Sequence, residues 1–412
     1  MIIFKKIFLY AASNASIAVA ALLLFPYYLS SLGVDAYNIL GLLLLVVGWL
    51  AFIDLGISAY IQKSINDETT IFPVKTIRLF DATNFFISII LALIVLSYVL
   101  VWYQAVNLTF LHAILISLLV PIKALQTVSR ATLMALMNYE FLAVTSLFFN
   151  LLKLALPILV YEVTQVQQVF DVVILSFLLV HVIETVIYRH KSRTMLLDRQ
   201  GHAICSDTKT FASHFRACLP LGLMGLLWSF ATQIERTIIY TSTNIDFLIF
   251  YNFAIQVISG LNLLFGSLLA VVLSYFLTLE SSKFYGNFKK LLIFSISSAI
   301  CVFSILLLLF KIFTGNQNSY YQIIESHQAA FLWMIGGVLV QFINSFSYIL
   351  ILKNSLHRIG SVVNIFTLVV MLFFSYFLFN NPGALIKVWP VLNLCIFVSV
   401  MPLLLRASRS KN

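Results

Sequence analysis

Long apolar runs alternate with short polar breaks along nearly the whole chain. Most of these runs are about 20 residues long, and a run of that length crosses the ~30 Å hydrocarbon core of a bilayer as one helix. About six such runs precede residues 189–216, the longest polar segment, and about six follow it. The pattern therefore predicts about twelve transmembrane helices, the sixth of which is expected to end at Tyr188.

Basic residues outnumber acidic ones in the polar segment 189–216. Because Lys and Arg are enriched in cytoplasmic loops, we place this segment in the cytoplasm. Elsewhere, basic loops alternate with loops free of Lys and Arg, which places both termini in the cytoplasm. We expect an N-terminal six-helix lobe over residues 1–188, a basic cytoplasmic linker over 189–216 and a C-terminal six-helix lobe over 217–412.

The composition excludes a soluble domain, since 61% of the residues are hydrophobic and 10% are charged. The fold class is therefore an all-α polytopic membrane protein. The net charge of +10 lies largely in loops, where it sets the topology, so binding to nucleic acid is disfavoured. The first apolar run continues to Leu32, longer than the core of a signal peptide, and predicts an uncleaved first helix.

The sequence lacks the motifs of the common enzyme classes. It contains no GxxxxGK[ST] loop, no HExxH and no GxSxG, and its four cysteines have no ligand-like spacing. The longest outer loop, residues 314–328, is short for a catalytic domain. We therefore expect no enzyme activity, no cofactor and no metal.

Several basic residues fall inside predicted membrane spans, and three of them are candidates for a role in the interior: Lys123, Lys153 and Arg236. A charged side chain at the bilayer centre costs at least ~2.5–3.5 kcal/mol unless it faces protein or water. Polar side chains recur at helical spacing beside them, which predicts a hydrated interior. One interpretation is a cavity whose cations bind an anionic substrate, especially phosphate. The other is structural pairing with Asp54, Asp81, Glu184 or Glu235, or snorkelling to a membrane interface.

The acidic residues Asp54, Asp81 and Glu235 also lie in predicted spans. They are candidates for proton or cation coupling, and ion pairing or helix capping explains them equally well. His112 and His181 are interpreted as ordinary interior histidines. The pattern leaves both roles open for the three carboxylates.

Several short motifs resemble the Wzx-type polysaccharide-lipid flippases of the multidrug/oligosaccharidyl-lipid/polysaccharide exporter superfamily. Two lie near helix ends in the first half and two on helices seven and eight, with Asn38 and Glu235 departing from the common Gly and Asp of the family pattern. They are residues 33–37 with the DLG of residues 54–56, residues 133–141, Leu219-Pro220 with Glu235-Arg236, and Tyr251 with Ala254.

This resemblance implies a two-lobed flippase in a bacterial inner membrane. Its substrate would be an undecaprenyl-pyrophosphate-linked oligosaccharide, such as an O-antigen repeat unit used in lipopolysaccharide biosynthesis. Transport would proceed by alternating access with ion coupling. Its partners would be lipid-linked oligosaccharide, membrane lipids, a polysaccharide polymerase and a chain-length regulator. The alternatives are a multidrug or small-solute antiporter of the same superfamily and a membrane glycan polymerase.

Overall fold

The computed structural model describes most of the chain, and the described part is helical and contains no strand. Helices satisfy all their backbone hydrogen bonds internally, as a hydrocarbon environment requires. The described residues are 27–48, 74–106, 108–136, 138–164, 168–200, 211–240, 245–278, 325–353, 357–378 and 381–409, with short pieces within 13–25, 56–61 and 287–322.

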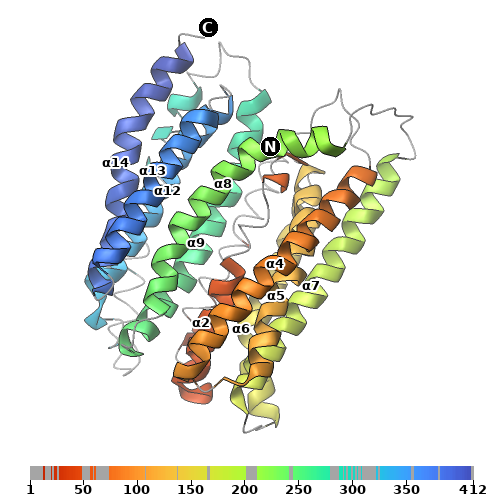
Figure 1. Cartoon of the computed structure of the whole chain (residues 1–412), viewed down its shortest axis with the longest axis vertical. Coiled ribbons are helices and arrows are strands. Elements are labelled where there is room, and N and C mark those ends of the chain that lie inside the picture. The colour runs from red at the N-terminus through yellow and green to blue at the C-terminus, as the bar shows by residue number, and fades with distance from the viewer. Residues whose placement is uncertain are drawn as a thin grey trace. The chain divides into compact units, whose positions relative to one another are not determined.

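The helices follow the order that the apolar runs predict (Figure 1). Gly33 lies between the first two helices. Its φ is 84°, a backbone conformation that glycine adopts without steric cost. In chain order they are η1 (Tyr28–Leu32), α2 (Val34–Gly48), α4 (Val74–Val106), α5 (Phe110–Ala135), α6 (Tyr139–Thr164), α7 (Val169–Gln200), α8 (Phe211–Tyr240), α9 (Ile245–Thr278), α12 (Gln328–Lys353), α13 (His357–Phe377) and α14 (Pro382–Arg409).

Within the described residues, 7 helices contain segments long and apolar enough to cross a membrane. Two further helices, α8 and α9, are 30 and 34 residues long. The first, second and ninth expected helices include residues outside the described ranges. The 7 segments are Thr76–Val101, Phe110–Ala135, Tyr139–Thr164, Val169–Leu197, Gln328–Ser347, Ile359–Phe377 and Pro382–Pro402.

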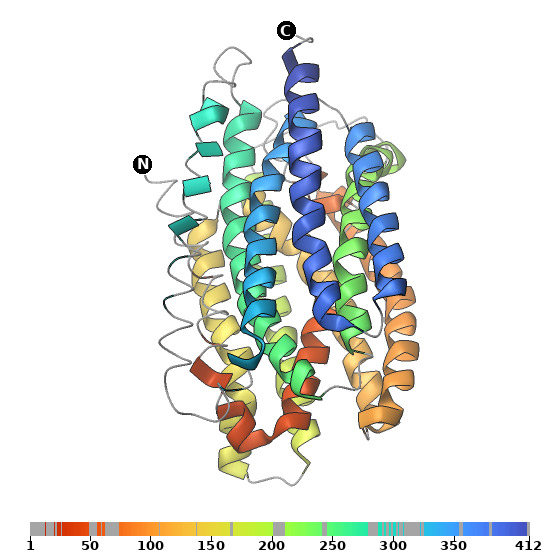
Figure 2. The same ribbon diagram turned by 90° about the vertical axis from the view of Figure 1, so that its left-hand side faces the viewer.

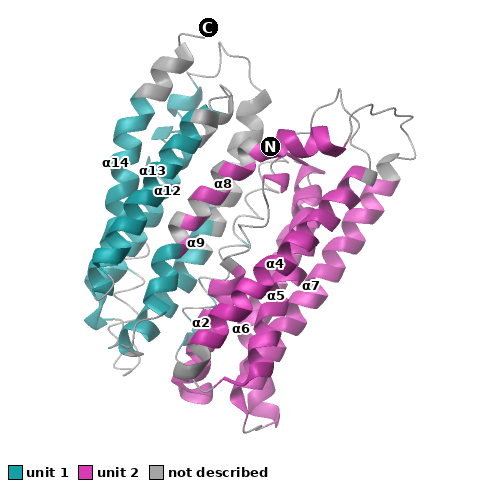
Figure 3. Ribbon diagram, viewed as in Figure 1, with its two compact units in different colours: residues 1, 3–26, 234–412 teal, residues 2, 27–233 magenta. Residues whose placement is uncertain are grey.

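The chain forms two compact units (Figure 3). Unit 2 contains residues 27–233, and unit 1 contains residues 3–26 and 234–412. The division falls inside α8, after Gln233. The expected lobe and linker boundaries at residues 188 and 217 stay a prediction.

In unit 2, α5 packs against both α4 and α7, and α6 packs against α7. An apolar cluster holds one end of this packing together, and it includes Phe80 of α4, Val128 of α5, Leu196 of α7 and Cys218 of α8. All four side chains are at most 7% exposed. Burying side chains of this size stabilises a fold by roughly 1.5–3 kcal/mol each in water, although lipid weakens that drive in the membrane core.

The start of α5 is fixed by a capping box. The Thr109 hydroxyl accepts from the His112 backbone N–H, and the Thr109 N–H donates to His112 Nδ1 over 2.9 Å. Because Nδ1 accepts, the proton lies on Nε2, which donates to Asp171 Oδ1 over 2.6 Å. His112 therefore joins the beginnings of α5 and α7, a structural role consistent with an interior histidine.

In unit 1, α12 packs most closely against α14, and the two helices run side by side in Figures 1 and 2. Asn344 donates to Asn393 over 3.3 Å, and Asn393 donates to the Trp389 carbonyl over 3.0 Å. A Cβ placed on Gly337 would lie 2.8 Å from Cγ of Pro390. The close approach of these helices therefore requires glycine at position 337. Small residues commonly allow membrane helices to pack this closely.

The sixth expected helix is longer than the sequence predicts. It was expected to end at Tyr188, but α7 continues to Gln200. Residues 189–200 contain neither Pro nor Gly, and several are strong helix formers, so the helix persists beyond its apolar part and ends just before Gly201 in the sequence. Arg189 thus lies within a helix rather than in a loop.

Candidate functional site

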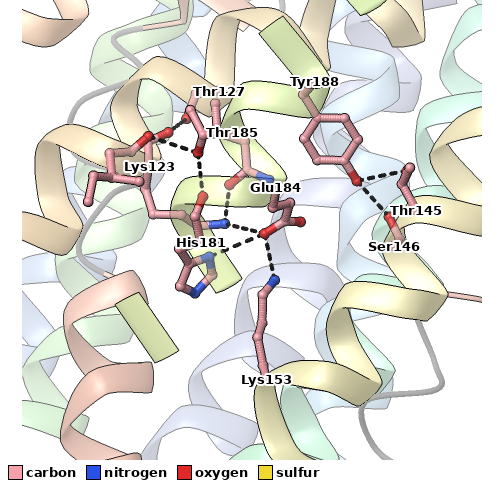
Figure 4. Close-up of polar contacts among 11 residues, drawn as sticks. Lys123, Thr127, Thr145, Ser146, Lys153, His181, Glu184, Thr185 and Tyr188 are labelled. Atoms are coloured by element: carbon pink, nitrogen blue, oxygen red, sulfur yellow. Dashed lines mark hydrogen bonds and ion pairs between the residues drawn. The ribbon is translucent and has the colours of Figure 1, made fainter. Parts of the chain in front are cut away.

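A buried carboxylate, Glu184 of α7, is the centre of a polar cluster in unit 2 (Figure 4). Lys153 Nζ of α6 lies 2.8 Å from Glu184 Oε2, and Lys123 Nζ of α5 lies 3.7 Å from the same oxygen. His181 Nδ1, one helical turn before Glu184, lies 3.2 Å from it. Three helices therefore present their polar side chains to one oxygen atom. We call Lys123, Lys153, His181 and Glu184 the Glu184 cluster.

The Glu184 cluster is almost completely enclosed. The side chains of Lys153, His181 and Glu184 are 8%, 2% and 4% exposed, and that of Lys123 is 14% exposed. Buried charges are retained only where partners compensate them. Two ammonium groups face one carboxylate here, so the cluster carries an excess of positive charge when both lysines and Glu184 are ionised.

Local sequence explains how α6 and α7 present these groups. His181 and Glu184 are three residues apart, so they lie on one helical face. Pro157 of α6 is four residues after Lys153 and lacks an N–H, so the helix cannot form the hydrogen bond that the Lys153 carbonyl would accept. The site therefore combines a paired ammonium with an interrupted backbone ladder.

Hydroxyl groups extend the polar layer beyond the charges. Tyr188, one turn after Glu184 on α7, has its hydroxyl 3.2 Å from Ser146 Oγ and 3.3 Å from Thr145 Oγ1 of α6. Thr185 donates to the His181 carbonyl over 2.7 Å. The Tyr188 contacts join α7 to α6 beside the Glu184 cluster, whereas the Thr185 bond lies within α7.

Several deeply buried polar atoms near these helices have no hydrogen-bond partner among the described residues. Gln126 accepts from Lys123 through Oε1, but its Nε2 is unpaired. His181 Nε2 is also unpaired, and so are both amide atoms of Asn84, which is 0% exposed on α4. Unpaired buried polar atoms are rare in native proteins. Their presence on α4, α5 and α7 shows that the interior between these helices contains polar groups.

Asp81, a candidate coupling residue, is paired in the structure. Its Oδ2 accepts from Arg189 Nη2 over 2.9 Å, which joins α4 to α7. Asp81 is 15% exposed and Arg189 is 25% exposed. The pair depends on the continuation of α7 past Tyr188, because a flexible loop would not hold Arg189 in place.

The remaining predicted residues lie elsewhere. Glu235 and Arg236 are half-buried on the part of α8 that belongs to unit 1. Tyr251 of α9 donates to Glu235 Oε1 over 3.4 Å, and Tyr240 donates to Asn252. The described residues form no ion pair with Arg236. Asp54 lies outside the described residues.

Both lysines are identified from the sequence as candidate site residues. Glu184 is predicted there only as a possible pairing partner, and His181 is interpreted as an ordinary interior histidine. The structural pairing that was left open for Lys123 and Lys153 is present, with Glu184 as the partner. The HxxE spacing on one face, opposite two mid-span lysines, was the available signal. Among the described residues no group of three or more metal-ligating His, Cys, Asp or Glu side chains occurs.

Similar proteins are found by comparing structures and not by comparing sequences. No protein-family model and no curated protein sequence matches this chain. A MOP superfamily transporter from Pyrococcus furiosus, described as having a binding pocket of reverse polarity, superposes with a TM-score of 0.61 at 13% identity, covering 98% of this chain and 96% of the other. The chain has the fold of these transporters.

Two further solved structures are multidrug resistance MATE family transporters of the same superfamily. The outward-facing one has a TM-score of 0.60 at 13% identity, covering 98% of this chain and 96% of the other. The inward-facing one has a TM-score of 0.59 at 13% identity, covering 96% and 95%. Transporters of this fold have twelve helices in two lobes, in agreement with the predicted all-α polytopic architecture.

Proposed function

We propose that this chain is a membrane transporter that moves an anionic lipid-linked oligosaccharide between leaflets by alternating access. The observation that carries the proposal is the Glu184 cluster, where Lys123 and Lys153 face a single carboxylate. Arg and Lys bind phosphate oxygens through charge-assisted hydrogen bonds. A pyrophosphate-linked sugar supplies such oxygens, and its lipid tail remains in the bilayer.

The fold supports transport but leaves the substrate open. The matched structures include an outward-facing and an inward-facing conformation of MATE family transporters, with nearly equal TM-scores. A fold that supports both states suits a mechanism in which access alternates. Another matched transporter is described as having a pocket of reverse polarity that suggests a different function. The sign of the buried charge, rather than the fold, is therefore our guide to substrate class.

In this proposal the two lysines pair first with Glu184 and then with the phosphate group of the substrate. In the absence of substrate, Glu184 compensates Lys153 and Lys123 in the interior of unit 2. An incoming phosphate group competes with Glu184 for these ammonium groups, so binding exchanges one ion pair for another and avoids uncompensated charge. Asp81, Glu235 and Asp54 remain candidates for ion coupling, and Asp81 would first have to leave Arg189.

A small-solute or multidrug antiporter is the second candidate. It is favoured by the multidrug resistance MATE transporters among the matched structures. It also agrees with Glu184 and Glu235 as carboxylates inside the helical bundle. The excess of cations over acids in the Glu184 cluster argues against a cationic drug as the substrate.

Complementation in a deletion strain of the source bacterium tests the proposal. Loss of surface polysaccharide with complete lipid-linked units trapped in the cytoplasmic leaflet of the inner membrane is expected, and wild-type chain restores export. Lys153→Met should fail to restore it at equal membrane abundance. Lys289→Met, which alters an exposed lysine, is the matched control and should restore it.

Other results would overturn the proposal in distinct ways. Unchanged polysaccharide with altered drug sensitivity would favour the antiporter. Units that reach the outer leaflet without being polymerised would indicate the glycan polymerase. Full complementation by Lys153→Met would remove the Glu184 cluster from the substrate path.

A further inference from the structure

A small cavity of about 60 Å³ lies among α4, α5 and α7, away from the Glu184 cluster. Its lining combines charged and hydroxyl groups with apolar side chains. The polar ones are Arg78, Asp81, Ser129, Thr132, Ser192 and Arg193. A pocket that contains two arginines and three hydroxyls has the donors that a phosphate group requires.

The depth of this cavity matches the lipid headgroups. Its lining residues lie near Thr76, Ala135 and Leu197, the ends of three membrane-spanning segments. None is more than about seven residues, or ~10 Å of helix, from those ends. The basic loops place this side in the cytoplasm, where anionic lipids attract basic residues.

The charge of the cavity is positive. Arg189 is paired with Asp81 over 2.9 Å and compensates this carboxylate. Arg78 and Arg193 both line the cavity, are exposed and form no ion pair with another described residue. Arg193 also interacts electrostatically with Asp81, the carboxylate that Arg189 already pairs. Three guanidinium groups therefore lie at or beside the cavity with one carboxylate, and the excess positive charge can bind an anion.

Two of the hydroxyl groups that line the cavity can turn to donate to a bound phosphate. Thr132 donates to the Val128 carbonyl over 2.9 Å, and Ser192 donates to the Arg189 carbonyl over 3.1 Å. Both bonds are to the residue's own helix, and a hydroxyl can rotate toward a better acceptor. Leu197, 59% exposed, lines the same cavity and offers an apolar edge for an acyl chain.

We propose that this cavity is a binding site for a phosphate group, carried by an anionic lipid headgroup or by free phosphate. Arg78 and Arg193 bind the phosphate oxygens, and Asp81 positions Arg189 beside them. The site is independent of the proposed transport function and of the Glu184 cluster. It would adjust the packing of α4 against α7 in response to the composition of the cytoplasmic leaflet.

The test uses the full-length chain in nanodiscs of phosphatidylcholine, with or without phosphatidylglycerol. Retained lipid is counted by native mass spectrometry, and the melting temperature is recorded. Phosphatidylglycerol should bind and raise the melting temperature of the wild type. In Arg78→Gln/Arg193→Gln its binding should weaken roughly tenfold or more, because the variant loses the charge-assisted hydrogen bonds that the two guanidinium groups make to the phosphate oxygens.

Two variants separate the site from general charge. Lys289→Gln/Lys290→Gln removes the same number of charges at exposed positions and should leave binding unchanged. Ser129→Leu keeps every charge but fills the cavity, and it should weaken binding as the arginine pair does. The three variants together distinguish a built pocket from attraction to a basic surface.

The source of the phosphate is decided by a parallel titration of inorganic phosphate in phosphatidylcholine nanodiscs. An arginine-dependent rise in melting temperature with phosphate alone identifies free phosphate, and a rise with phosphatidylglycerol alone identifies the headgroup. The proposal is overturned if the lysine variant loses as much binding as the arginine variant, or if neither ligand depends on Arg78 and Arg193.

Discussion

Lys153 Nζ lies 2.8 Å from Glu184 Oε2, and the two side chains are 8% and 4% exposed. Their helices, α6 and α7, thus meet at an ion pair that is nearly sealed from solvent. Removing one member of such a pair leaves an uncompensated charge in the interior, which costs about 3–5 kcal/mol. The two members are not equivalent, because Lys123 also approaches Glu184.

Glu184→Gln should therefore be more destabilising than Lys153→Met. The first change leaves two ammonium groups without a carboxylate and should lower the free energy of unfolding by about 3–5 kcal/mol. The second leaves Lys123 to compensate Glu184 and should cost less. Reversible unfolding in mixed micelles measures both. The double variant should be more stable than Glu184→Gln alone, and strictly additive effects would contradict the pairing.

Gly337→Ala should destabilise the packing of α12 against α14. A Cβ there would lie 2.8 Å from Cγ of the rigid Pro390 ring, so the helices must move apart. We expect a loss of about 1–3 kcal/mol, seen as a lower melting temperature. Gly336→Ala is the matched control, since a Cβ on Gly336 meets no atom within 4 Å. Equal effects at both positions would show that helix approach is not the cause.

Asn84→Leu should leave stability unchanged or raise it by about 1 kcal/mol. Asn84 is 0% exposed, and neither of its amide atoms has a partner among the described residues, so the change removes no hydrogen bond. Asn393, also 0% exposed, is hydrogen-bonded to Asn344 and Trp389, and Asn393→Leu should be destabilising. Chemical unfolding compares the two. A large loss at Asn84 would indicate that its amide has a partner other than the described residues.

His112→Ala should lower stability by about 1–2 kcal/mol, because it removes the side-chain acceptor of the Thr109 N–H and the hydrogen bond to Asp171 while the Thr109 cap remains. His112→Gln should cost less, because a glutamine at this position of a capping box also accepts from the Thr109 N–H. Thermal unfolding of the two variants and of Asp171→Asn separates the cap from the contact with α7. If His112→Gln were as harmful as His112→Ala, the contact with Asp171 would dominate.

The sequence by itself determined the class of architecture and much of its detail. Apolar runs of about 20 residues require helices in a bilayer, because hydrocarbon cannot satisfy open backbone groups. The cost of charge in a span identified Lys123, Lys153 and Asp81 as residues that need a partner or water. Helical spacing placed each on a polar face, and the structure gives each an ion-pair partner within unit 2.

Tertiary structure alone decided which polar faces meet. The helical period fixes the direction of a side chain on its own helix, but not the neighbour it encounters, so nothing local pairs Lys123 and Lys153 with Glu184. The ion pair of Asp81 with Arg189 could not be predicted for a second reason. The apolar residues predicted that α7 ends at Tyr188, but the helix continues and includes Arg189. Such pairs depend on packing between helices that are far apart in the sequence, since Asp81 and Arg189 are 108 residues apart. This packing is a property of the folded chain rather than of any segment within it.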